Sequence, residues 1–176
     1  APLEVRCAWG PQNNYCFTTT ALTSKIWLIY LDDNNEWQAK AVADIGDASK
    51  IPLPVDISIS ADDSLLWVNT WNDGLTRVFD VSDPFTPKEV YTKKIGKQIN
   101  MLSQSWDGSR VYFTSSLLSN WDKEHRNVKG DVQYFKAYQW NGEELAEKFS
   151  IDFIAAKLGL PHQMRFGSYA LYAMDR

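Results

Sequence analysis

Two histidines and two cysteines are the residues of this 176-residue chain best suited to bind a metal or to react. His162 lies in PHQMRF near the C-terminus, three residues before Arg165 and among apolar neighbours. Imidazole nitrogen is a common metal ligand and a common acid–base group. We therefore consider His162 as a metal ligand or catalytic residue, with a hydrogen-bonded structural histidine as the alternative.

Two other charged candidates have simpler interpretations. His125 lies in WDKEHRNV, whose composition is that of a solvated loop, so we expect an exposed histidine there. Arg165 is expected to pair with a carboxylate in a structural role, because guanidinium groups match carboxylates in a bidentate geometry.

The two cysteines, Cys7 and Cys16, flank the turn-like segment GPQNN. If EVRCAW and NYCFTT form a hairpin, the cysteines face each other across it and can form a disulfide. Such a bond closes a short loop and stabilises little. Two buried free thiols are the alternative.

Composition excludes two classes of partner. The formal net charge is −4, whereas binding to a phosphate backbone requires clustered Lys and Arg, so we expect no nucleic acid. No stretch approaches the roughly 20 apolar residues of a membrane span. A basic segment followed by an apolar one, the pattern of a signal peptide, is also absent from the sequence.

The elements that must position these residues form a repeat. ISISADDSLLWVNTW (57–71) and NMLSQSWDGSRVYFTSS (100–116) share an apolar run, a serine, a turn and an aromatic-rich run, and EVRCAWGPQNNYCFTTTAL is a looser copy. Each copy continues into a β-type segment (SKIWLIYLD, LTRVFDVSD or VQYFKAYQW) and a final apolar strand. Four strands in roughly 45 residues are typical of a β-propeller blade.

The fold class is therefore predicted to be all-β, with about three blades of a larger propeller, seven-bladed by preference. The blade-like repeats are expected at 3–50, 51–97 and 98–154, followed by a closing segment at 155–176. IDFIAAKLGL (151–160) is the one predicted helix. Because propellers close with roughly four to eight blades, we expect N-terminal blades of the same protein, or a second chain, to complete the ring.

Within these blades, Asp56 opens a strand that would be innermost. It is expected either to face the central channel or to cap a turn, as aspartate does before many strands. Trp71 and Trp121 are expected to pack between blades. Trp121 and Asp122 are expected to form a structural corner, with a place at the substrate entrance as the alternative.

Several long segments carry a family resemblance. PLEVR (2–6), DISISADDSLLWVNTWNDGLTRVFDVSDPFTP (56–87), SQSWDGSRVYFTSSLLSNWDK (103–123) and PHQMRF (161–166) resemble, in the same order, the C-terminal part of the selenium-binding protein family. The chain departs from that family's pattern after His162, where it reads GSYALYAMDR instead of a Gly-Gly-Asp-Cys segment.

The resemblance implies an activity, because enzymatic members of this family are methanethiol oxidases. It implies copper-dependent oxidation of methanethiol by O2 and water to formaldehyde, hydrogen sulfide and hydrogen peroxide. It also implies a periplasmic location, as in bacterial members, or a cytoplasmic one, as in animal and plant members. The alternative to this enzyme is a non-catalytic propeller scaffold that binds selenium or protein. A homo-oligomer is also considered.

Under this resemblance His162 is the expected copper ligand and catalytic residue, either bound to the metal or directly beside it. With two histidines in the sequence, the chain supplies one or two ligands at most, and the others are expected from the N-terminal blades. Cys7 and Cys16 do not match the family's cysteine motif, so neither is assigned to copper or selenium.

Overall fold

The computed structural model describes residues 2–116 and 132–164, and all structural statements concern these two ranges. They contain twelve β-strands in three four-stranded antiparallel sheets, each a meander of consecutive strands. The first sheet consists of β1 (Pro2–Cys7), β2 (Tyr15–Thr20), β3 (Lys25–Leu31) and β4 (Trp37–Asp44). The second consists of β5 (Pro54–Ile59), β6 (Leu65–Thr70), β7 (Leu75–Asp80) and β8 (Lys88–Lys94). The third consists of β9 (Ile99–Gln104), β10 (Arg110–Ser115), β11 (Tyr134–Trp140) and β12 (Leu145–Asp152).

The strands form where side chains of alternating character can separate onto two faces. In β11, Tyr134, Lys136 and Tyr138 are buried while Phe135 and Ala137, on the other face, are partly exposed. Short turns connect the strands, and Asp or Ser side chains accept hydrogen bonds within many of them. Asp62 Oδ1, for example, accepts from the backbone N–H of Ser64 at 3.1 Å. The predicted repeat of four-stranded units is therefore confirmed.

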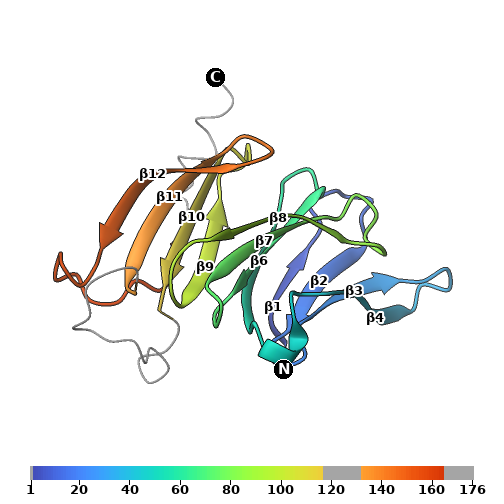
Figure 1. The fold of residues 1–176 in the computed structure, drawn as a ribbon. Helices are drawn as coiled ribbons and strands as arrows, with labels where there is room; N and C mark the ends of the chain where they lie inside the picture. Colours follow the sequence, from blue (N-terminus) through green and yellow to red (C-terminus); the bar gives the residue numbers. More distant parts are fainter. Residues whose placement is uncertain (1, 117–131, 165–176) are drawn as a thin grey trace.

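The three sheets stand side by side in chain order (Figure 1). The first strand of each sheet is the inner one: β1 contacts β5, and β5 contacts β9. The fourth strands of the first and third sheets, β4 and β12, lie at opposite edges of the assembly (Figure 1). This is the arrangement expected of consecutive propeller blades, with β1, β5 and β9 facing the axis.

Two apolar cores fill the spaces between neighbouring sheets. Between the first and second sheets, Phe17, Ile26 and Leu28 pack against the second sheet's Leu66 and Val68, and all five are inaccessible to solvent. A second core joins the second and third sheets and contains an edge-to-face pair of Trp67 and Trp140 with ring centroids 5.1 Å apart. Most of the stabilising apolar burial therefore lies between sheets.

The helix predicted for 151–160 is wrong. β12 extends to Asp152, and a turn follows in which the Asp152 carboxylate accepts hydrogen bonds from the backbone N–H groups of Ile154 (2.9 Å) and Ala155 (3.0 Å). Lys157 then adopts a left-handed conformation with φ of 57°, which ends the turn. The Asp152 bonds are those that begin a helix, but the left-handed residues Lys157 and Gly159 (φ of 88°) stop it after a single turn.

The described residues also include one short 3-10 helix, η1 (Ala48–Lys50), which precedes the second sheet. None of the helices in 2–116 and 132–164 has the length and hydropathy of a membrane-spanning segment.

Candidate functional site

His162 lies in an extended segment that runs along the third sheet. Thr114 Oγ1 on β10 donates to the His162 carbonyl at 2.6 Å, and Ser103 Oγ on β9 donates to the Met164 carbonyl at 2.7 Å. Ser103 and Thr114 occupy the face of the sheet opposite to its core, because core residues such as Phe113 alternate with them. Residues 161–164 therefore cover the inner part of the face that points away from the second sheet.

The His162 ring is oriented by a backbone carbonyl. Its Nδ1 lies 2.9 Å from the carbonyl oxygen of Ser116, immediately after β10. The same oxygen accepts a hydrogen bond from Asn100 Nδ2 at 2.7 Å. A carbonyl oxygen can only accept, so the short contact places the imidazole proton on Nδ1. In the neutral ring Nε2 then carries the lone pair, and His162 is exposed.

The described residues do not form a complete metal site by themselves. No three side chains of His, Cys, Asp or Glu within 2–116 and 132–164 are grouped so that they could hold a metal ion. A neutral imidazole with one nitrogen bound to a carbonyl and the other free is the form in which histidine binds copper. His162 therefore fits copper as a single ligand, and any further ligands must lie outside these residues.

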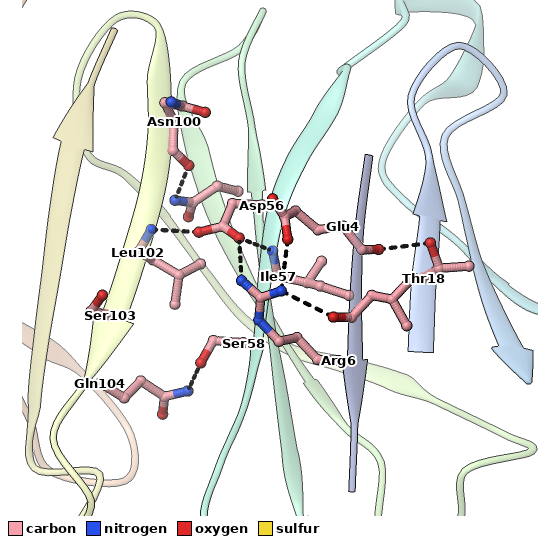
Figure 2. A network of polar contacts seen from close by, with 12 residues as sticks. Glu4, Arg6, Thr18, Asp56, Ile57, Ser58, Asn100, Leu102, Ser103 and Gln104 are labelled. Atoms are coloured by element: carbon pink, nitrogen blue, oxygen red, sulfur yellow. Dashed lines mark hydrogen bonds and ion pairs between the residues drawn. The ribbon is translucent and has the colours of Figure 1, made fainter. Parts of the chain in front are cut away.

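Asp56 is the second candidate residue, and it is fully buried on the inner strand β5. Its Oδ2 accepts from the backbone N–H of Leu102 on β9 at 2.8 Å, and its Oδ1 accepts from the N–H of Ile57 at 2.9 Å. Arg6 Nη2 on β1 lies 3.3 Å from the same Oδ1 (Figure 2). Asp56 thus joins the inner strands of all three sheets. The expectation that it caps a turn is wrong, because it lies within β5 and bonds across sheets.

Burial dominates the electrostatics of this carboxyl. It raises the pKa of Asp56 to about 6, although the Leu102 N–H and the Arg6 guanidinium both favour the ionised form. Arg6 is about one third exposed and also pairs with Glu4 at 2.6 Å, so its charge is divided and screened. Asp56 therefore titrates close to neutral pH.

Sequence reasoning missed most of this network. It did not single out Glu4, Arg6, Asn100 or Ser116. The partners of Asp56 are 46 and 50 residues away along the chain, in neighbouring sheets. Opposite charges within two successive inner strands, Arg6 in β1 and Asp56 in β5, are the sequence signal that could have indicated it.

Cys7 and Cys16 form a disulfide across the β1–β2 hairpin. They are directly opposite each other in the strand pairing, which brings their side chains together on one face. The alternative of two buried free thiols is therefore wrong, and neither sulfur is available as a thiolate ligand while the disulfide is formed.

The remaining candidates are divided between described and undescribed residues. Trp71 is 6% exposed, but it belongs to neither core between sheets, where Trp67 and Trp140 lie instead. Its backbone N–H donates to the Leu53 carbonyl at 2.9 Å. The predictions for Trp121, Asp122, His125 and Arg165 concern positions outside the described residues.

Comparison with known proteins identifies the family. Residues 1–169 match the family model described as 56 kDa selenium binding protein. The chain is 62% identical over 173 residues to a methanethiol oxidase of Ruegeria pomeroyi, covering 98% of this chain and 39% of that protein. It is 58% identical over 168 residues to a methanethiol oxidase of Hyphomicrobium, covering 96% of this chain and 38% of that one. The chain thus spans about two fifths of the length of these relatives.

Solved structures agree with this assignment. A hypothetical selenium-binding protein from Sulfolobus tokodaii superimposes with a TM-score of 0.74 at 29% identity, covering 87% of this chain and 41% of that one. The β-propeller domain of Cps50 from Myceliophteria thermophila gives a TM-score of 0.61 at 10% identity, covering 85% of this chain and 45% of that one, which supports the fold alone. The three sheets are thus blades of a partial β-propeller, and the chain belongs to the selenium-binding protein family.

Proposed function

We propose that the protein containing this chain is a methanethiol oxidase that requires copper. The proposed reaction converts methanethiol, O2 and water to formaldehyde, hydrogen sulfide and hydrogen peroxide. The two bacterial relatives at 62% and 58% identity that carry the name methanethiol oxidase support the substrate. Because the chain spans about two fifths of those relatives, the activity belongs to a larger assembly of which these blades form one part.

His162 is the residue that we assign to copper binding. The observation that carries this assignment is the contact between His162 Nδ1 and the Ser116 carbonyl, which in the neutral ring leaves the lone pair on Nε2. When bound, copper would supply redox chemistry and affinity for a soft thiolate. The chain's own contribution is to hold the His162 segment and its imidazole in place through Thr114 and Ser116.

We also propose that additional blades complete a seven-bladed ring. Apolar side chains remain exposed on the outward faces of both terminal sheets. Leu3 and Val5 of β1 are 46% and 49% exposed, and Phe149 of β12 is 52% exposed and contacts Phe135. Further blades packed on these faces would bury this surface, as the existing cores do between the described sheets.

A periplasmic location is part of the proposal. The Cys7–Cys16 disulfide supports it, since such bonds form and persist in oxidising compartments and are rare in the cytosol. Cytoplasmic expression followed by thiol labelling without reductant, compared with expression of a periplasmically targeted form, tests whether the disulfide depends on an oxidising compartment. Unlabelled cysteines in the periplasmic form and labelled ones in the cytoplasmic form are the expected result.

The experiment that tests the function compares His162→Ala with His125→Ala in the complete protein. We expect His162→Ala to lower both the copper content and the release of sulfide and peroxide from methanethiol by at least tenfold. His125→Ala removes the other histidine of the chain, which is expected in a solvated loop from the composition of its segment, and serves as the matched control.

Two results would contradict this proposal. Full copper occupancy and full thiol turnover in His162→Ala would remove the site assignment. An unmodified protein with neither copper nor product would instead favour the non-catalytic propeller scaffold.

A further inference from the structure

Ser116 has an unusual backbone conformation at the point where His162 is held. Its φ is 75°, in the left-handed region that residues other than glycine rarely occupy, and it is 4% exposed. Such conformations persist when surrounding contacts fix them, and they often occur at functional sites. Here the conformation coincides with a carbonyl that faces two donors, Asn100 Nδ2 and His162 Nδ1.

Asn100 is the buried member of this group. It is inaccessible to solvent, and its own backbone carbonyl accepts from Asn69 Nδ2 at 2.8 Å (Figure 2). Its Nδ2 donates to the Ser116 carbonyl at 2.7 Å, whereas its Oδ1 accepts no hydrogen bond from any described residue. A buried amide with an unsatisfied oxygen is unfavourable for stability. The single hydrogen bond to Ser116 is therefore the interaction that accounts for an asparagine at this position.

The contacts also decide between two arrangements of protons. Asn100 Nδ2 lies 3.4 Å from His162 Nδ1 and could in principle donate to it. In that case Nδ1 would be unprotonated and would face the Ser116 oxygen at 2.9 Å, acceptor against acceptor. With the proton on Nδ1, both donors share one carbonyl oxygen, which has two lone pairs. The second arrangement satisfies every short contact.

We infer that Asn100 is a positioning residue for His162: by holding the carbonyl of Ser116, it keeps the imidazole proton on Nδ1 and the lone pair on Nε2. Asn100 acts through the carbonyl and does not itself reach a ligand on Nε2. The effect on the ring is independent of any metal. Its consequence for copper rests on the proposed function.

The test is nitrogen NMR of the metal-free, 15N-histidine-labelled complete protein at pH 8.5, with the His162 signals identified by their loss in His162→Ala. In the unmodified protein we expect Nδ1 to show a protonated shift and Nε2 an unprotonated one. In Asn100→Leu we expect the proton to redistribute toward Nε2, as in free histidine in water. Asn100→Leu removes an incompletely satisfied amide and retains the side-chain volume, so the fold is expected to persist.

Asn69→Leu is the matched control. Asn69 is also a fully buried asparagine that donates to a backbone carbonyl, but that carbonyl belongs to Asn100, not to Ser116. We expect its His162 spectrum to match that of the unmodified protein. If the copper assignment is correct, Asn100→Leu also weakens copper binding by about 10- to 100-fold, the usual effect of losing a group that orients a ligand.

Either of two spectra would overturn the inference. One is a protonated Nε2 in the unmodified protein, a result that does not depend on any variant. The other is an unchanged proton position in Asn100→Leu. If His162→Ala retains its copper while the tautomer follows Asn100 as expected, the function proposal fails and the positioning role stands.

Discussion

Arg6 Nη2 lies 3.3 Å from Oδ1 of Asp56, and this contact joins the inner strand of the first sheet to that of the second. The arginine is partly exposed whereas the carboxyl is fully buried, so the cost of removing charge from water falls mainly on the carboxyl. Burial of the carboxylate outweighs the attraction to the guanidinium and raises the pKa of Asp56 to about 6. The junction of the blades therefore contains a group that changes its charge near neutral pH.

The first prediction concerns the pH dependence of stability. The folded pKa of Asp56 is about 6, above the value of about 3.9 for an unfolded aspartate. Between those values the folded chain retains a proton that the unfolded chain has released, so the free energy of unfolding falls as pH rises. The contribution is fully present below the unfolded pKa and is lost as pH passes the folded one. A difference of about two units corresponds to about 3 kcal/mol.

Asp56→Asn should remove this component. Urea unfolding of the unmodified protein and of Asp56→Asn between pH 4 and pH 8 measures it as the difference between the two curves. Carboxyls whose pKa is lowered by hydrogen bonds, such as Asp62 and Asp107, are present in both proteins. Their contributions to the pH dependence therefore cancel in the difference. Asp33→Asn, at an exposed position, is the control for replacing one carboxyl of the chain by an amide. Parallel curves for Asp56→Asn and the unmodified protein would contradict the prediction.

The second prediction concerns the partner of this carboxyl. Arg6→Met keeps much of the aliphatic stem but removes the charge that favours ionised Asp56, so its cost should grow with pH. We expect a destabilisation of about 1 to 2 kcal/mol at pH 8 and a smaller one at pH 4.5, where Asp56 is mostly protonated. Chemical unfolding at the two pH values measures the difference. Equal costs at both would show that Arg6 acts through packing alone.

The extent to which sequence predicted the structure depends on how local each feature is. Strand identity follows from alternation within a few residues, as in Tyr134, Phe135 and Lys136, and so the repeat of four strands was predictable. The segment after Asp152 was mistaken for a helix because its apolar spacing is typical of one, whereas the left-handed conformation of Lys157, which ends it after one turn, has no signal in the residue type.

The site depends on contacts that sequence spacing does not encode. His162 was identified as a candidate from its segment, but the group that orients it, the Ser116 carbonyl, lies 46 residues earlier. A backbone carbonyl has no sequence signature. The left-handed conformation of Ser116 could not be predicted either, because serine rarely adopts it. Asp56 was likewise a candidate whose partners in the neighbouring sheets became evident only in three dimensions.

The third prediction concerns the disulfide. Cys7 and Cys16 are separated by 9 residues, so the bond closes a short loop. A loop of this size corresponds to about 2 to 3 kcal/mol of stabilisation in the chain-entropy description, more than the small effect expected from its shortness. Cys7→Ser with Cys16→Ser should lower the unfolding free energy by about that amount and leave the NMR signals of His162 unchanged. A change at His162 would show that the hairpin and the histidine segment are coupled.

The fourth prediction concerns Asp63, which connects the first two sheets at the opposite end of the inner strands from Asn100. Its Oδ1 accepts from the Trp9 N–H at 2.7 Å, and its Oδ2 accepts from the Gly10 N–H at 2.8 Å and from Asn13 Nδ2 at 2.7 Å. Asp63 also has a φ of 59°, a left-handed conformation that glycine would adopt without strain. At the corresponding turn of the third sheet the residue is Gly108, with φ of 69°.

Asp63→Gly therefore distinguishes the stabilising effect of the carboxylate from the strain of the left-handed backbone. It relieves the strain but deprives three donors of their acceptor, and we expect a net loss of about 1 to 3 kcal/mol in unfolding free energy. Hydrogen exchange should accelerate at the Trp9 and Gly10 amides specifically. Asp62→Gly, which removes a carboxylate bonded within its own turn to Ser60 and Ser64, should leave those two amides protected. If Asp63→Gly proves as stable as the unmodified protein and protects Trp9 equally well, the carboxylate does not hold the two blades together.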